Sequence, residues 1–442
     1  MKADILKQRL ASLGASTLAE HLVQLADSHG QIHDYLMRLV ASPEDLFASV
    51  SDRIHSLKDF VFDLPWNSES ELTEELEEIL KDLEALPDTC FQAADLVIDF
   101  FKTDTFVAEH IHHSYSIESA YSDAASHLVR FGRAYPDKRY LADAVLELLI
   151  SDEYGMREEI AHRAAEFLPQ DEVRRLVGMF RQPGSHRTNR TAAMMAKSLG
   201  DTALMEEIQI TSTGQIPDNV LLDIAEVHLA NNDAPAALAY LQGIPETSNC
   251  SYDRTSMLKT AYRMVEDWNS LEMILRNELR SFPTIDRLDA LVDVIGEDRR
   301  QDTIDTERDA ILTGRNLSTY GVQFLIDTGH IFEAGEYILS RQNQLQGSFY
   351  SELLPIAEAL VKASCELAAS CIYRSLLTDI LDRGCSKAYH HGVDYLNALD
   401  SLASVITDWK GVEDHTAYKA RLIEKHKRKY SFWQQYPTEP TA

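Results

Sequence analysis

The sequence LLDIAEVHLANNDAPAALAYL at residues 221–241 decides the fold, because TSMLKTAYRMVEDWNSLEMIL repeats its pattern 34 residues later, at 255–275. Each copy has an apolar helical face, a polar break and a second apolar face. A period of 34 residues is that of tetratricopeptide helix hairpins, which must stack on neighbours to bury their apolar stripes. The matching positions are Ile224 and Leu258, His228 and Tyr262, Asp233 and Asp267, Ala237 and Leu271, Tyr240 and Ile274, and Leu241 and Leu275.

The repeat is degenerate, because Ala225 falls on Lys259 and the aromatic and glycine positions of the full tetratricopeptide signature are missing. A third hairpin is predicted at 319–342, with Gly329 and His330 in its turn and Ala334 at the start of its second helix. Its distance from the first two hairpins is not a multiple of 34 residues, and we attribute this difference to an insertion at 296–306.

The rest of the chain also has the periodicity of helices rather than strands. Residues 16–60 predict three short helices, with Ser16, Ser28 and Ser42 as candidate N-caps and Pro43 in the first turn. We therefore predict an all-α fold: an α-solenoid of stacked antiparallel helix hairpins that forms a right-handed superhelix, HEAT-like in its N-terminal half and degenerate tetratricopeptide-like in its C-terminal half.

Two changes in composition divide the chain, QPGSHRTNR at 182–190 and TSTGQIPD at 211–218, with a helix pair or one bent helix between them. The second break is the preferred boundary, because the repeat spacing is clearest after it. The predicted regions are a HEAT-like region at 1–210, tetratricopeptide-like repeats at 217–415, and a basic helix and tail at 416–442.

The chain is strongly acidic, with 42 Lys and Arg against 71 Asp and Glu and a net charge of −29. Such a surface repels nucleic acid over most of its area and favours basic or amphipathic partners. Residues 69–84 hold eight acidic side chains and one lysine, yet their apolar residues keep helical spacing. This run is interpreted as the solvated face of an amphipathic helix. Its apolar residues are Leu72, Leu76, Ile79, Leu80 and Leu83.

The N-terminus alternates charged and apolar residues, and no apolar run approaches the roughly 20 residues of a membrane span. We therefore expect a cytoplasmic protein without membrane contact. The five cysteines form no CxxC pair, which indicates buried, reduced thiols. They are Cys90, Cys250, Cys365, Cys371 and Cys385.

The sequence contains no phosphate-binding loop, dinucleotide fingerprint, zinc-protease motif or nucleophile elbow, so no catalytic, cofactor or metal residue is predicted. His110, His112 and His113 form a cluster that could hold zinc or nickel, but no Cys or acidic partner stands at the matching spacing. His390 and His391 invite the same idea, and we expect them to pack between hairpins. Cys365 and Cys371 lie among apolar residues, which suits packing better than nucleophilic attack.

Basic residues are concentrated only at the C-terminus, where six cations between 419 and 429 stand against Glu424. Cations near the end of a helix stabilise its dipole, and they also pair with an acidic body. Six exceed what capping needs, so contact with a protein partner or with phosphate stays open. The candidate partner-binding residues are Lys425, Lys427, Arg428, Lys429 and Trp433.

The blocks LADAVLELLISDEYGMREEI (141–160) and HTAYKARLIEKHKRKYSFW (415–433) resemble an uncharacterised bacterial domain-of-unknown-function family of helical proteins. Asp152, Tyr154 and Gly155 are the most distinctive residues inside the chain, with 431–433 at its end. Some relatives are joined to SWIM-type zinc fingers. This chain has no CxC or CxH ligand pair, so the resemblance implies no DNA binding of that kind and no catalytic residue.

The favoured function is a non-catalytic scaffold or adaptor whose acidic concave surface binds a protein or peptide, one that is basic or amphipathic. One alternative is an enzyme or nuclease accessory subunit with its site in the solenoid groove. Another is a nucleic-acid binder that uses the basic C-terminal helix. The sequence does not indicate an oligomeric state.

Overall fold

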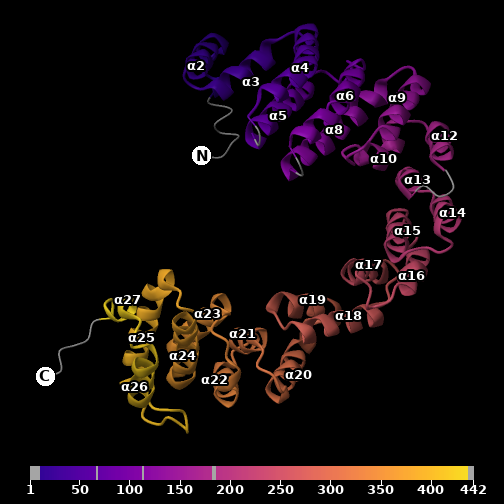
Figure 1. The fold of residues 1–442 in the computed structure, drawn as a ribbon. Coiled ribbons are helices and arrows are strands. Elements are labelled where there is room, and N and C mark those ends of the chain that lie inside the picture. Colours follow the sequence, from indigo (N-terminus) through magenta and orange to yellow (C-terminus); the bar gives the residue numbers. More distant parts are fainter. Residues whose placement is uncertain (1–9, 66–67, 112–113, 182–185, 437–442) are drawn as a thin grey trace. The chain divides into compact units, whose positions relative to one another are not determined.

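The computed structural model describes residues 10–65, 68–111, 114–181 and 186–436. Helix is the only regular structure in these residues, which contain no strand (Figure 1). The all-α prediction is therefore confirmed. The helices form two compact units, residues 1–257 and residues 258–442, and the division falls within α17 (Ser251–Met264).

Unit 1 begins with long hairpins and has shorter helices in its middle. Its helices are α2 (Ala15–Ser28), α3 (Gly30–Val40), α4 (Pro43–Asp63), α5 (Glu69–Ala85), α6 (Ala93–Phe101), α7 (Asp104–His110), α8 (Tyr115–Ala134), α9 (Lys138–Ile150), α10 (Glu158–His162), α11 (Ala164–Phe167), α12 (Gln170–Phe180), α13 (His186–Ser198), α14 (Thr202–Thr213), α15 (Asp218–Ala230) and α16 (Ala234–Gly243).

Unit 2 contains three short 3-10 turns, η1 to η3, as well as α-helices. Its elements are α18 (Trp268–Ser281), α19 (Ile285–Ile295), η1 (Glu297–Arg299), α20 (Arg300–Thr313), α21 (Thr319–Asp327), α22 (Ile331–Ser340), η2 (Gln342–Gln344), α23 (Tyr350–Lys362), α24 (Glu366–Arg383), η3 (Ser386–Ala388), α25 (Tyr389–Ala403), α26 (His415–His426) and α27 (Tyr430–Trp433).

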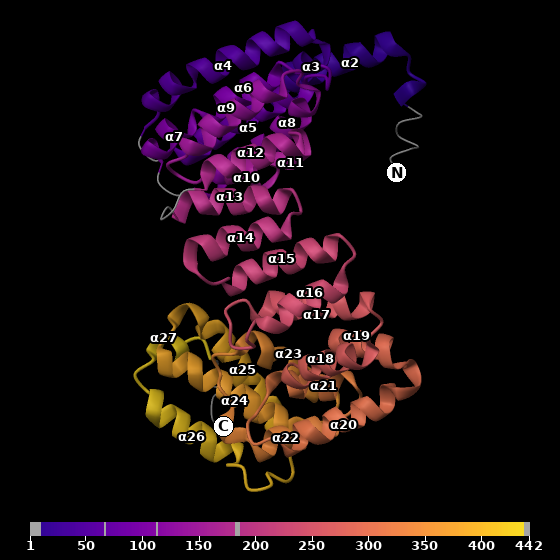
Figure 2. The same ribbon diagram turned by 90° about the vertical axis from the view of Figure 1, so that its right-hand side faces the viewer.

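Within each unit, helices pack against their neighbours in the chain, as stacked hairpins do. In unit 2, α21 packs on α22 and α23 on α24, while α21 also touches α23 and α22 also touches α24. First helices of successive hairpins thus lie beside first helices, and second helices beside second helices. Figure 2 lets the reader follow this order along the chain. The arrangement is consistent with a helical solenoid.

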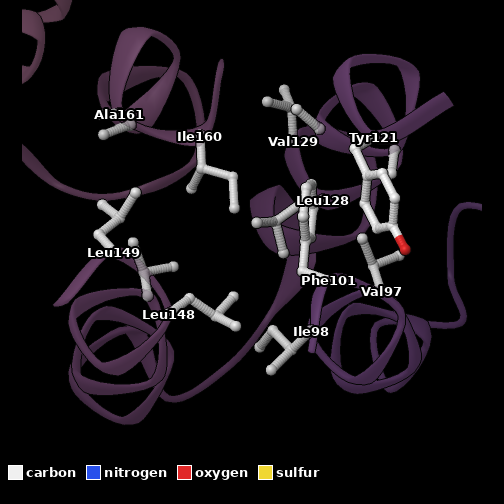
Figure 3. Close-up of a cluster of buried hydrophobic side chains, with 14 of the residues drawn as sticks. Val97, Ile98, Phe101, Tyr121, Leu128, Val129, Leu148, Leu149, Ile160 and Ala161 are labelled. Atoms are coloured by element: carbon white, nitrogen blue, oxygen red, sulfur yellow. The ribbon is translucent and has the colours of Figure 1, made fainter. Parts of the chain in front are cut away.

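The core of unit 1 is one continuous apolar cluster that runs from Leu46 to Val227. Figure 3 shows part of it, where side chains of α6, α8, α9 and α10 point toward one another. Tyr121 of α8 is fully buried there, and its hydroxyl lies 2.7 Å from the hydroxyl of Thr103. The buried phenol therefore keeps a hydrogen-bond partner, as a buried polar group requires.

The 34-residue repeat is present in the backbone of the turns as well as in the apolar pattern. Asn232 and Glu266 both adopt the left-handed conformation, with φ of 58° and 57°. The amides of the next residues donate back into the preceding helix, Asp233 to the carbonyl of His228 at 2.8 Å and Asp267 to that of Tyr262 at 2.9 Å. This six-residue closure ends one helix, and the aspartate that follows starts the next.

Each of these two aspartates caps the second helix of its hairpin. A carboxylate oxygen of Asp233 accepts from the amide of Ala236 at 3.2 Å, and one of Asp267 accepts from the amide of Ser270 at 3.1 Å. The same turn, a left-handed residue followed by a helix start, recurs elsewhere in the described chain. The other pairs are Gly200 and Asp201, Gly329 and His330, and Ser364 and Cys365.

Three of the apolar pairs matched by the repeat are buried in both copies, while Tyr240 and Ile274 are half-buried. Ala237 and Leu241 are completely buried in α16, and Leu271 and Leu275 occupy the same places in α18. The turn at Gly329, with a φ of 85°, confirms the third predicted hairpin. The segment 296–306, to which we attribute the departure from the 34-residue period, forms η1 and the start of α20. A further helix pair, α19 and α20, lies between the second and third hairpins.

Two of the three predicted N-caps are also wrong. Ser16 lies inside α2, and the hydroxyl of Ser28 donates to the carbonyls of Gln24 and Leu25 at the helix end. Ser42 does cap α4, where its hydroxyl accepts from the amide of Asp45 at 3.1 Å, with Pro43 in the first turn. Residues 186–213 form a helix pair, α13 and α14, rather than one bent helix.

Candidate functional site

Helices α2 and α3 expose an unusual amount of apolar surface. Only Ala26 is buried in α2, and none of the side chains described in α3 is buried. Val40 and Leu39 of α3 are 75% and 65% exposed, although the apolar spacing of α3 predicts a buried face. Eight large apolar side chains between residues 10 and 40 are exposed: Leu10, Leu13, Val23, Leu25, Tyr35, Met37, Leu39 and Val40.

An acidic cavity of about 750 Å³ lies between α3 and α5. Its charged lining is five carboxylates and one ammonium group: Asp34, Glu69, Glu74, Glu77, Glu78 and Lys81. We call this cavity, together with the exposed apolar residues of α3, the α3–α5 face. The prediction for residues 69–84 is confirmed, because Leu72, Leu76, Ile79, Leu80 and Leu83 are buried while most carboxylates of α5 face outward.

A second cavity, of about 490 Å³, shares Asp34 and Glu78 with the first and is crossed by ion pairs. Asp82, buried in α5, accepts from Arg38 of α3 at 2.5 Å and from Arg53 of α4 at 2.8 Å. Burial alone would raise the pKa of Glu78, but hydrogen bonds from Lys81 and Arg38 lower it. This network joins α3, α4 and α5, and leaves Glu74 and Glu77 at the rim as carboxylates outside any ion pair within the described chain.

The predicted basic segment packs onto unit 2 through its apolar residues and several ion pairs. Tyr418 and Leu422 of α26 and Phe432 of α27 are buried in the core of that unit. Lys425 lies 2.7 Å from the carboxylate of Asp382 in α24, and Lys427 lies 2.7 Å from Glu424. Two of the five candidate residues are therefore paired inside the molecule.

The other three candidate residues differ in how free their side chains are to contact a partner. The ammonium nitrogen of Lys429 approaches Gly384 at the end of α24, where it faces the negative pole of that helix dipole. Trp433 is half-buried, and its indole N–H donates to the carbonyl of His426 at 3.0 Å. Arg428 is exposed and forms no ion pair with any described residue. Of these three residues, Arg428 is therefore the exposed cation without an ion pair among the described residues.

A carboxylate of α25 also holds the basic segment in place. Asp400 of α25 accepts from Lys419 at 2.8 Å and contacts the Tyr436 hydroxyl and the His415 imidazole. Burial alone would raise the pKa of Asp400, but these hydrogen bonds lower it. The contacts fix α26 and the residues after it against α25, a role that residue spacing in the sequence did not indicate.

The histidine and cysteine predictions need correction at two places. His112 and His113 lie outside the described residues, so only His110, at the end of α7, is placed. His390 and His391 are exposed, with ring centroids 3.9 Å apart, and are not packed between hairpins. Cys385 is exposed, and Cys90, Cys250 and Cys365 are half-buried, so the prediction of buried thiols holds only for Cys371. Burial raises the pKa of the Cys371 thiol to about 11. All five cysteines are free thiols.

The distinctive triplet of the family resemblance organises the loop between α9 and α10. Asp152 is buried and accepts from the amide of Gly155 at 2.8 Å, and Gly155 has a φ of 81°. This turn directs Arg157 into the core, where its guanidinium meets Asp104. Tyr154 is 45% exposed. Two residues of the triplet therefore support the packing of unit 1.

Two kinds of feature are absent from the described residues. No group of three or more His, Cys, Asp or Glu side chains in them is arranged to hold a metal ion. Among the described helices, none combines the length and the apolar character that crossing a bilayer requires.

Comparison with known proteins gives one match. The model of a family of unknown function (DUF6880) matches residues 2–227 and residues 189–435, so the two matches together span almost the whole chain. No curated protein and no solved structure matches the chain. The comparisons show no relative with a SWIM-type zinc finger.

Proposed function

The chain belongs to a family of unknown function (DUF6880), and we propose that it is a non-catalytic helical-repeat scaffold that binds a basic, amphipathic segment of a partner protein. The α3–α5 face is the proposed binding surface. The repeat class we propose is HEAT-like for residues 1–210 and tetratricopeptide-like for 217–415. We place its action in the cytoplasm.

The observation that carries this proposal is the apolar exposure of the N-terminal hairpin. A helix face of a solenoid that lies in contact with solvent is usually polar. Here α2 and α3 expose six large apolar side chains, and Leu10 and Leu13 before them are exposed as well. A contiguous exposed apolar surface marks an interaction site, so a partner that covers this hairpin explains its composition.

Charge selects the kind of partner. The cavity beside α3 has five carboxylates and one lysine, and the chain as a whole carries a net charge of −29. An amphipathic helix with lysines or arginines on one side can contact both parts of the α3–α5 face, the acidic cavity and the exposed apolar residues of α3. Its apolar stripe covers Tyr35, Met37 and Val40, and its cations reach Glu74 and Glu77. An anionic or phosphate-bearing partner is repelled at this surface.

The experiment is a fluorescence anisotropy titration of the full chain with a labelled model peptide of alternating Leu and Lys in helical register. Glu74→Gln with Glu77→Gln is expected to weaken binding several-fold. Tyr35→Ser with Val40→Ser is expected to weaken it as strongly, because the apolar half of the contact is lost. A neutral peptide, with Gln in place of Lys, should bind more weakly than the basic one.

Matched controls distinguish this surface from general acidity. Glu153→Gln with Glu246→Gln removes two exposed carboxylates of unit 1 that lie outside the α3–α5 face. Tyr252→Ser removes a tyrosine that is 84% exposed elsewhere. Equal weakening by the control variants would disprove the assignment of the surface. Light scattering shows whether a second copy of the chain covers the hairpin instead, and a stable dimer lost in Tyr35→Ser with Val40→Ser would replace the proposed partner.

A further inference from the structure

A pocket in unit 2, separate from the α3–α5 face, combines an apolar floor with a cationic rim. Its volume is about 340 Å³, at the lower end of the range typical of small-molecule sites. The floor is formed by Leu376, Ile380 and Tyr395, which are 1%, 8% and 7% exposed. Tyr350 stands at the mouth and is 62% exposed.

The rim is rich in groups that attract an anion. Arg383, Lys387, His390 and His391 all line the pocket, and Asp379 is its one carboxylate, already hydrogen-bonded to Arg383. This balance is the reverse of the whole chain, which is strongly acidic. In the described chain, the imidazoles of His390 and His391 contact each other but have no hydrogen-bond partner. Their nitrogens are therefore available to a ligand.

The position of these cations in the fold is not explained by helix stability. Lys387, His390 and His391 surround the start of α25, whose first turn contains no acidic residue and whose N-cap, Ala388, offers no side-chain hydrogen bond. The start of a helix is the positive end of its dipole, so basic residues there are unfavourable and an anion is favourable. Arg383, in contrast, sits at the end of α24, where the dipole and its pairing with Asp379 account for it.

We propose that this pocket binds a small organic carboxylate with an apolar body, such as an arylalkanoate. The apolar body fills the space over Leu376, Ile380 and Tyr395, and the carboxylate lies at the rim near Lys387, His390 and His391. Binding neutralises the charge of Lys387 near the start of α25 and gives the imidazole N–H groups an acceptor. The proposal does not depend on the α3–α5 face and can fail or succeed independently of it.

The pocket can be tested in the protein without any substitution, because the exposed thiol of Cys385 lines it and can report on its occupancy. The rate of alkylation of each cysteine of the full chain by N-ethylmaleimide is followed by mass spectrometry, with phenylacetate as the probe. Millimolar phenylacetate is expected to slow alkylation of Cys385 several-fold. Cys250, a half-buried thiol of unit 1, should react at an unchanged rate. Phenylacetamide, which has the same shape without the charge, should protect weakly or not at all.

Variants then test the rim. Lys387→Gln should lose most of the protection by phenylacetate, and Lys387→Arg should keep it. Lys362→Gln is the matched control, because Lys362 is an exposed lysine of unit 2 that does not line the pocket. An unchanged rate at Cys385 in phenylacetate would overturn the site. Equal protection by phenylacetamide, or full protection in Lys387→Gln, would overturn the assignment to an anion.

Discussion

Arg157 and Asp104, 53 residues apart in the chain, form a bidentate ion pair in the core of unit 1. Nε of Arg157 donates to one carboxylate oxygen at 2.7 Å and a terminal nitrogen donates to the other at 2.5 Å. The remaining nitrogen donates to the carbonyl of Leu148 at 2.7 Å and to the hydroxyl of Ser151 at 2.9 Å. The two side chains are 3% and 1% exposed, so both charges are buried and paired.

Arg157→Met should destabilise unit 1 by about 3–5 kcal/mol, because it leaves the carboxylate of Asp104 buried without a partner. Arg157→Lys should recover little, since an ammonium group cannot form the bidentate contact. The double variant Asp104→Leu with Arg157→Met should be more stable than Arg157→Met alone, because no unpaired charge remains. Calorimetry measures these changes, and an Arg157→Met protein as stable as the parent would contradict the pairing.

Arg374 of α24 is buried like Arg157, but it has no carboxylate partner among the described residues. Arg374→Met should therefore lower the free energy of unfolding by less than about 1 kcal/mol. One of its nitrogens donates to the carbonyl of Glu413 at 2.6 Å, but its other two have no hydrogen-bond partner within the described residues. Its guanidinium carbon lies 4.5 Å and 4.9 Å from the ring centroids of Tyr418 and Trp409. Burial lowers the pKa of Arg374, which means the charge itself is unfavourable there.

The prediction is tested by comparing the loss of stability in Arg374→Met with that in Arg157→Met. Both are replaced by methionine, and the unfolding of each unit is followed by hydrogen exchange, which reports on local stability. A loss of several kcal/mol in Arg374→Met would mean that the two cation–π contacts outweigh the cost of the unpaired donors.

His127 of α8 should make unit 1 less stable as the pH falls from about 7 toward 5. Burial lowers the pKa of this imidazole, with Glu84 and Asp123 opposing the shift and Arg130 adding to it. The unfolded state then binds a proton near the ordinary pKa of about 6.5, before the folded state does. Stability therefore falls as the pH drops through that value and levels off below the folded-state pKa.

His127→Gln should flatten this part of the stability curve while leaving the region below about pH 4.5, where carboxylates titrate, unchanged. Denaturant unfolding at a series of pH values measures both regions. If the slope between pH 7 and 5 is the same in the variant and the parent, the imidazole of His127 does not contribute to it.

Ala237→Asp should destabilise the hairpin of α15 and α16 severely, by several kcal/mol, because Ala237 is completely buried and the new carboxylate would have no partner. Ala239→Asp on the same helix is the control, since Ala239 is exposed. Thermal unfolding of the two variants should differ clearly. Equal melting temperatures would mean that the repeat register at 221–245 is not the one described.

Binding of a cationic peptide at the α3–α5 face should weaken as salt rises, because exposed charges are screened beyond about 8 Å at physiological ionic strength. Replacing Lys425, Lys427, Arg428 and Lys429 with Gln makes the chain more acidic, so this binding should stay equal or tighten slightly. A phosphate-bearing partner should instead lose affinity, with a shallower salt dependence. Weakened nucleic-acid binding in the quadruple variant, with no effect of Glu74→Gln on the peptide, would favour the nucleic-acid alternative.

Local features of this fold could be predicted from the sequence because they depend on a few adjacent residues. The breaks at Asn232 and Glu266, the cap at Ser42 and the apolar side of α5 are all encoded within about one helical turn. Exposure could not be predicted in the same way. Leu39 and Val40 have the spacing of a buried face, and they are exposed because no further element covers α3 within the described chain.

Contacts between residues far apart in the chain could not be predicted from the sequence either. Pairing of Arg157 with Asp104 depends on how α7 packs near the loop after α9, which no spacing reveals. The pocket at Lys387 and His390 forms where α24, α25 and the segment before α23 meet. The adjacent histidines were a visible signal, but only the fold shows that they stand at a helix start without an acidic residue.

Four hairpin turns, at Asn232, Glu266, Gly329 and Ser364, are each closed by a backbone hydrogen bond that spans six residues, so each turn is specified by its own residues. Nothing in such a junction depends on how many hairpins precede or follow it. Whole hairpins can therefore be gained or lost in evolution without disturbing the junctions that remain, provided that the apolar faces on either side of the change still match. Family members of this architecture are accordingly free to vary in length by discrete steps of one hairpin.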